Sequence, residues 1–169
     1  MTEPAIEQSF KDRHREISEL ARELTIIRKH NLRFREGDPQ DTMLLFAEAA
    51  LVLVVLERFV RAVVRDARDS DTIYNLLQKA VSSRVLTLPW DDQEDGIRRI
   101  NVVRNTLLHG NYEQAAKQSG CSSVPEFFKL KFASEVEALN QAVNDLMRQI
   151  DPTTGERYVR EGGLNGEEE

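Results

Sequence analysis

Hydrophobic residues recur every three or four positions along most of the chain, which is the pattern of amphipathic helices. Residues 4–32 show it clearly, with apolar positions spaced by three, four or seven: Ile6, Phe10, Ile17, Leu20 and Leu24. Residues 42–56, TMLLFAEAALVLVVL, are apolar on nearly every side, which predicts a helix buried in the core or in a subunit interface. This stretch is shorter than the roughly 20 residues that a bilayer span needs, so no membrane helix is expected.

Capping residues and helix breakers set the expected boundaries of the other helices. Asp41 or Thr42 can cap the buried helix, Ser122 or Ser123 can cap the last one, and Gly110 can end the fourth. A proline in the segment RVLTLPWDD excludes a helix interior there. The expected helices cover residues 4–32, 42–70, 72–83, 92–108, 111–120 and 122–150. The predicted fold is an all-α bundle of about five to six helices.

The composition changes after residue 150, which divides the chain into a helical domain (1–150) and a tail (151–169). The tail, DPTTGERYVREGGLNGEEE, carries six acids and two arginines and is rich in glycine, so we expect it to be flexible. The whole chain has a net charge of −6, which argues against a nucleic-acid partner. Without the tail the balance is 21 basic to 23 acidic side chains, so the charge of the domain itself leaves such a partner open.

Several classes of protein are not expected from this composition. Cys121 is the single cysteine, which excludes an internal disulfide and a cysteine-rich metal site. The N-terminal residues have no apolar leader segment, so we expect a cytoplasmic protein. The acidic run DDQED lacks the spaced ligands of a calcium loop, and no glycine-rich phosphate loop is present. We therefore expect neither a metal nor a cofactor.

Residues 104–112, RNTLLHGNY, stand out because a helical projection places Arg104 on the apolar side of the fourth helix. Five residues form that apolar side: Ile97, Ile100, Val103, Leu107 and Leu108. The opposite side carries a polar stripe with spacings of three and four: Arg98, Asn101, Asn105, His109 and Tyr112. A guanidinium keeps its charge, so Arg104 needs a carboxylate, a set of carbonyls or an external phosphate.

Two interpretations of this stretch stay open. In the first, Arg104 forms a salt bridge with Glu48 or Glu57 of the apolar helix, and His109 interacts with the dipole at a helix end. In the second, Arg104 faces a cleft that accepts an anion. Residues five apart on a straight helix point about 140° away from each other. Arg104 and His109 can therefore converge only if the helix breaks near Gly110, or if a second chain presents its own pair across a two-fold axis.

The letters RNTLLH match the R-x4–6-H motif of the HEPN superfamily. The chain also resembles that family over about residues 5–150, because the motif closes a late helix of an all-α domain. Many members are metal-independent endoribonucleases that act as homodimers, with the active site where the two motifs meet. They include toxins of toxin–antitoxin pairs and effectors of anti-phage defence. The resemblance implies catalytic roles for Arg104 and His109 with support from Asn105, an RNA substrate, a homodimer, and an antitoxin or defence-system protein as a further partner.

These residue types suit RNA cleavage without a metal. Histidine titrates near neutral pH and can act as a general base on the 2′-OH or as a general acid on the leaving oxygen. Arg104 offers a fork of donors to the charge of a phosphorane, and Asn105 lies one turn before His109, where it can orient the imidazole. The expected products end in 2′,3′-cyclic phosphate. The alternative, from another class, is a non-catalytic all-α dimerisation or interaction module of a regulatory or defence system.

Further candidates for RNA contact are weaker. Tyr112 and Asn101 belong to the polar stripe of the motif helix. Four arginines of the apolar helix recur on one face and could follow an RNA backbone: Arg58, Arg61, Arg65 and Arg68. The same arginines would equally suit a solvated face paired with three nearby acids: Glu57, Asp66 and Asp69.

Overall fold

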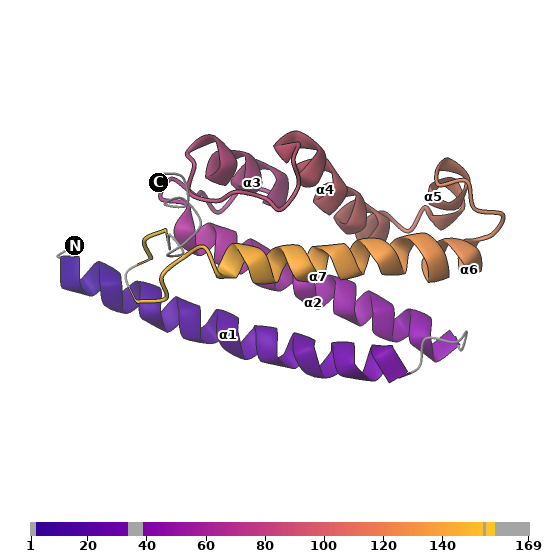
Figure 1. The fold of residues 1–169 in the computed structure, drawn as a ribbon, viewed down its shortest axis with the longest axis horizontal. Coiled ribbons are helices and arrows are strands. Elements are labelled where there is room, and N and C mark those ends of the chain that lie inside the picture. The colour runs from indigo at the N-terminus through magenta and orange to yellow at the C-terminus, as the bar shows by residue number, and fades with distance from the viewer. Residues whose placement is uncertain (1–2, 34–38, 154, 158–169) are drawn as a thin grey trace, which may run out of the picture.

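The computed structural model describes residues 3–33, 39–153 and 155–157, and over these ranges the chain is all-α (Figure 1). Its elements are α1 (Glu3–Arg33), α2 (Pro39–Val63), α3 (Ile73–Ser82), α4 (Gln93–His109), α5 (Tyr112–Gln118), α6 (Val124–Glu126), the π-helix η1 (Phe127–Phe132) and α7 (Ala133–Met147). Because α6, η1 and α7 follow one another without a break, the described residues form six helical rods. This confirms the predicted all-α bundle.

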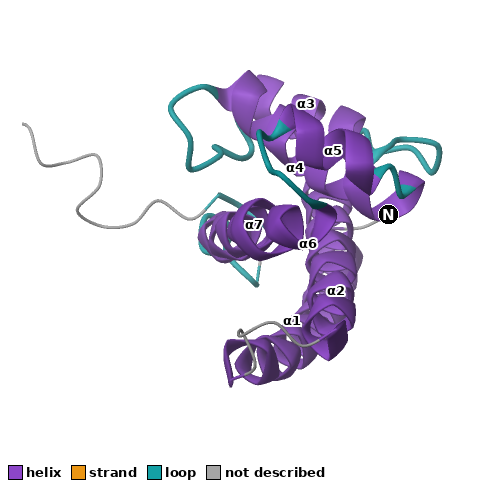
Figure 2. Ribbon diagram, turned by 90° about the vertical axis from the view of Figure 1, so that its right-hand side faces the viewer, coloured by secondary structure: helices purple, strands orange, loops and turns teal. Residues whose placement is uncertain are grey.

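The helix α2 lies at the centre of the arrangement and contacts α1, α3, α4 and α7. The two long helices α1 and α2 lie side by side along one edge of the molecule, and α7 lies next to α2 (Figure 1). The shorter helices α3, α4 and α5 cover the opposite side, which a view turned by 90° also shows (Figure 2). The C-terminal end of α4 lies toward α5 and α6, at one end of the molecule (Figure 1).

The central place of α2 follows from its apolar sequence. Five of its larger apolar side chains are 0–1% exposed: Val52, Val55, Leu56, Phe59 and Val60. Burying one side chain of this size stabilises the folded state by roughly 1.5–3 kcal/mol. The fold is therefore most stable when other helices cover α2 on several sides. Within the described part of the chain, no helix is long and apolar enough to cross a membrane.

Several helix ends lie at the residues that the sequence marks as caps. The Thr72 hydroxyl accepts the backbone N–H of Asn75 (3.4 Å) at the start of α3, and Ser123 accepts that of Glu126 (3.3 Å) at the start of α6. Such caps satisfy N–H groups that have no partner inside the helix. The predicted limits of α3 and α4 and the start of the last helical rod are therefore confirmed.

The limits of α2 differ from the prediction at both ends. The helix begins at Pro39, so Asp41 and Thr42 lie inside it, and it ends at Val63 instead of near Ser70. The early end has a local cause, because the chain folds back over the last turn of the helix. Arg61 donates to the carbonyl oxygens of Arg68 (2.6 Å) and Asp71 (3.0 Å), which fixes the following loop against the last turn of the helix.

The first residues of the predicted acidic tail form a turn that contacts the helical domain. Asp151 and Glu156 are joined by a backbone hydrogen bond of 2.6 Å, within a turn that an isolated β-bridge between Ile150 and Arg157 closes. Arg157 then donates to the carbonyl oxygen of Arg84 (2.9 Å). Arg157 of the predicted tail therefore contacts the helical domain, and the division of the chain at residue 150 stays a prediction. The rest of the expected tail, residues 158–169, lies outside the described residues.

The π-helix η1 has no counterpart in the sequence prediction, which expected one regular helix from residue 122 to residue 150. Phe127 and Phe132 are five residues apart and would point in different directions on an α-helix. In η1 both are buried, with ring centroids 6.2 Å apart. The wider turn therefore lets both rings enter the core, and short π-helical segments of this kind occur often at functional sites.

Candidate active site

The motif residues lie in the last two turns of α4, which ends where Gly110 takes a left-handed conformation. The φ angle of Gly110 is 63°, a region that costs little for glycine and more for other residues. His109 is the last helical residue and is exposed, so its imidazole lies at the negative end of the helix dipole. The predicted position of the motif at a helix end is therefore confirmed.

Arg104 is half-buried in this structure. Its Nη1 donates to Oδ1 of the neighbouring Asn105 at 3.3 Å. Among the described residues, this is the only hydrogen-bond or ion-pair partner that the guanidinium has. Most of its N–H donors are therefore available to an anion.

The acids that could have neutralised Arg104 are engaged elsewhere. Glu48, only 2% exposed, accepts a hydrogen bond from Asn140 Nδ2 (2.7 Å) and lies 4.0 Å from Arg28 Nε. Glu57 instead pairs with Arg61 at 3.0 Å. The interpretation in which Arg104 forms a salt bridge with one of these acids is therefore wrong.

The imidazole of His109 does not face the guanidinium of Arg104 within one chain. Helix geometry separates the two directions by about 140°, because α4 stays helical from one residue to the other. The side chain of Asn105 is exposed and points in a direction between those of Arg104 and His109, about 40° from that of His109. The structure thus brings Arg104 and Asn105 into contact and leaves His109 on the neighbouring face.

One residue of the expected apolar face is exposed. Leu108 is 59% exposed, whereas Ile100 and Val103 are each 2% exposed, and Leu107 packs against the core in part. Val102, expected on neither face, is 54% exposed. The motif residues Asn105 and His109 therefore share their surface with two exposed aliphatic side chains.

Tyr112 has a packing role next to the motif. Its ring lies 5.6 Å from that of Phe46 on α2 and 5.0 Å from that of Phe128 on η1. These tilted contacts hold the first residue of α5 against the core, directly after the helix break. Asn101, one turn before Asn105, is half-buried, and the predicted contact of either residue with RNA stays a prediction.

The arginines of α2 lie away from the motif. Phe46, which contacts Tyr112, marks the motif end of α2, and Arg58 lies about 18 Å further along the helix axis. Arg58 pairs with Glu16 of α1, and Arg61 pairs with Glu57 as the alternative interpretation expects. Arg65 is exposed just after α2 ends. The structure therefore does not bring these side chains together with Arg104 and His109.

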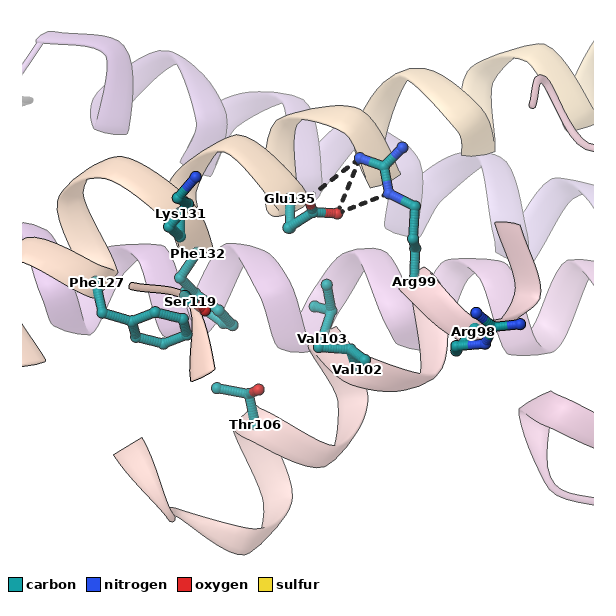
Figure 3. A pocket seen from close by; sticks show the side chains of 10 residues that line it. All are labelled: Arg98, Arg99, Val102, Val103, Thr106, Ser119, Phe127, Lys131, Phe132 and Glu135. Carbon is teal, nitrogen blue, oxygen red and sulfur yellow. Dashed lines mark hydrogen bonds and ion pairs between the residues drawn. The ribbon is translucent and has the colours of Figure 1, made fainter. Parts of the chain in front are cut away.

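A pocket of about 220 Å³ lies between α4 and η1 and was not predicted from the sequence (Figure 3). Its floor and walls come from Val103 of α4 and from Phe127 and Phe132 of η1, and Ser119 closes one end. At the other end Arg99 and Glu135 are joined by hydrogen bonds of 3.0–3.1 Å. The sequence signal for this pocket was the spacing of Phe127 and Phe132. They are five residues apart, which fits a π-helical turn better than an α-helical one.

Over the described residues, no group of three or more histidine, cysteine or carboxylate side chains could hold a metal ion. Comparisons with protein-family models, with curated proteins and with solved structures give no match for this chain. Inferences about its function therefore depend on the geometry of α4 and its surroundings.

Proposed function

We propose that this protein is a metal-independent endoribonuclease of the HEPN type, in which Arg104, Asn105 and His109 form half of an active site. The observation that supports this most is the state of Arg104. It is half-buried, is oriented by Asn105 at 3.3 Å, and has no carboxylate partner among the described residues. A guanidinium of this kind is suited to bind a phosphate with several N–H donors at once.

The proposed reaction is transesterification of an RNA phosphodiester. One imidazole takes the proton of the 2′-OH as the 2′-oxygen forms its bond to phosphorus. Arg104 stabilises the extra negative charge of the phosphorane. The bond from phosphorus to the 5′-oxygen then breaks, and an imidazolium donates the proton that this leaving oxygen needs. The products are a 2′,3′-cyclic phosphate and a free 5′-OH.

A second copy of the chain completes the proposed site. Arg104 and His109 diverge within one helix, so an arginine and a histidine can meet on one phosphate when two copies of α4 pair across a two-fold axis. The exposed Leu108 (59%) lies beside the motif and would be covered in such a pair. Two imidazoles at one site would also divide the roles of base and acid.

Cleavage of total RNA and of tRNA by purified protein tests this function. We expect activity in the presence of EDTA, products with 2′,3′-cyclic ends, and a rate at least about 100-fold lower in Arg104→Ala and in His109→Ala. Matched controls are Arg22→Ala and His14→Ala, which change the same residue types on α1 and should cleave like the wild type. Cleavage that persists in His109→Ala, or that requires added magnesium, would contradict the proposal.

We further propose that the nuclease acts as a toxin or as an anti-phage or stress effector, held in check by an antitoxin or another partner of its system. Induced expression should then arrest growth of the host cell, and His109→Ala should abolish the arrest. Normal growth with full levels of an active enzyme would argue against this role.

A further inference from the structure

We propose that the pocket between α4 and η1 binds one unpaired base of a single-stranded RNA, beside the phosphate that the motif residues cleave. This inference rests on the proposed function and names the form of RNA that the site takes. Its support comes from the size and lining of the pocket, the charges at its rim, and its position on α4.

The size of the pocket fits one base. Its volume of about 220 Å³ is below the roughly 300–1,000 Å³ that is typical of sites for drug-sized ligands. The surface offered by Val103, Phe127 and Phe132 is apolar, whereas the side chains of Thr106 and Ser119 can hydrogen-bond the edge of a base. A base inside a duplex is not accessible to such a slot, so the geometry favours an unpaired one.

The charges at the rim suit a nucleic-acid backbone. Arg99 is neutralised by the bidentate contact with Glu135, and its guanidinium also lies 5.1 Å from the centre of the Trp90 ring. Arg98 makes only an exposed contact of 3.3 Å with Asp95, and within the described ranges Lys131 has no acidic partner. Two cations therefore remain at the mouth of an apolar slot, where they can bind phosphates on either side of an inserted base.

The pocket and His109 lie on the same side of α4. Val102, which lines the pocket, points within about 20° of the direction of His109, and Thr106 lies one turn before His109. Arg104 points away from this side. A strand that leaves the pocket along α4 would therefore pass the imidazole first, which places the bound base next to the reacting phosphodiester.

The first test measures binding and needs no cleavage. A fluorescein-labelled RNA hexamer with 2′-fluoro sugars lacks the attacking hydroxyl, and a second hexamer of the same length has abasic central positions. By fluorescence anisotropy we expect wild-type protein to bind the abasic hexamer at least about fivefold more weakly. Ser119→Trp should fill the pocket and remove this difference, whereas Ser82→Trp, at an exposed position of α3, should retain it.

The second test reverses one positive charge at the rim of the pocket. Lys129 and Lys131 are both exposed residues of η1, but only Lys131 lines the pocket. Lys131→Glu and Lys129→Glu change the net charge equally, so any difference between them reports on the pocket. We expect Lys131→Glu to weaken binding at least about tenfold and to lower the salt dependence by about one phosphate contact, with a much smaller effect of Lys129→Glu.

The outcomes separate this inference from the proposed function. Equal affinity of wild-type protein for both hexamers, or equal effects of the two lysine substitutions, would overturn the base-binding pocket even if the protein cleaves RNA. Pocket-dependent binding by a protein that cleaves no RNA would support the pocket and contradict the nuclease. Circular dichroism melts show whether Ser119→Trp is folded, and the Lys131 comparison decides the question if it is not.

Discussion

At the scale of single residues, Gly110 connects the backbone of the motif helix to the placement of His109. Its φ of 63° is unfavourable for alanine, so Gly110→Ala should lower the free energy of unfolding by about 1 kcal/mol in urea denaturation. Gly120→Ala is the matched control, because Gly120 has a φ of 72° and open space around it. Both variants should lose similar stability, but only Gly110→Ala should also cleave RNA more slowly. Equal cleavage by both would show that the helix end does not position His109.

The local character of a residue was easier to predict than its partners. The helical projection placed Arg104 on the apolar side, and it is half-buried. The same projection placed Leu108 there, and Leu108 is exposed, although the neighbouring Leu107 packs against the core in part. The assignment of Glu48 to Arg104 was wrong, because Asn140 and Arg28 come from helices whose packing against α2 no local pattern reveals.

At the scale of elements, the loop before α3 depends on one ionised carboxylate. The ammonium of Lys79 and the backbone N–H of Arg68, each 2.7 Å from Asp71 Oδ2, hold the pKa of Asp71 below its ordinary value of 3.8. A lowered pKa in the folded state means that the stabilisation is complete above the unfolded-state pKa and is lost as the pH falls through the folded-state pKa. Asp71→Asn should therefore lower the Tm by a few degrees at pH 7.

The same melts at pH 3 provide the check on this prediction. The difference in Tm between wild type and Asp71→Asn should shrink there, because pH 3 lies below the ordinary pKa of 3.8 and the stabilisation declines as the pH falls from that value toward the lowered pKa of the folded state. Asp69→Asn, at an exposed position of the same loop, should leave the Tm nearly unchanged at both pH values. A difference that stays constant from pH 7 to pH 3 would mean that the ionisation of Asp71 is not what stabilises the loop.

The helices themselves were largely predictable because their signals are local. Caps such as Thr72 and Ser123 act within a few residues, and apolar periodicity needs no knowledge of the partner helix. The end of α2 and the π-helix η1 were missed for a common reason. Each depends on how the chain packs back on itself, through Arg61 and its carbonyl partners in one case and through the buried rings of Phe127 and Phe132 in the other.

At the scale of the whole molecule, the fold explains which side of α4 stays uncovered. The core is built around α2, and α4 contributes one buried side to it, with Ile100 and Val103 each 2% exposed. The remaining surface of α4 carries Asn105 and His109 together with exposed aliphatic side chains. Sequence reasoning could place the motif on one helix, but it could not show which groups that helix leaves uncovered.

Mixing experiments can show whether two chains share one site. Equal amounts of wild-type and His109→Ala chains are unfolded and refolded together, so that about a quarter of the dimers contain two wild-type chains. If each dimer has a single site that needs both histidines, the mixture should have about a quarter of the activity of the same total amount of wild-type dimer. Independent sites within each chain would give about half. Mixing wild type with Arg22→Ala, a variant that should cleave like the wild type, should leave the full activity and controls for refolding losses. A result of one half would exclude a single site that needs both histidines, and would mean that one histidine is enough at each site, whether its Arg104 comes from the same chain or from the partner.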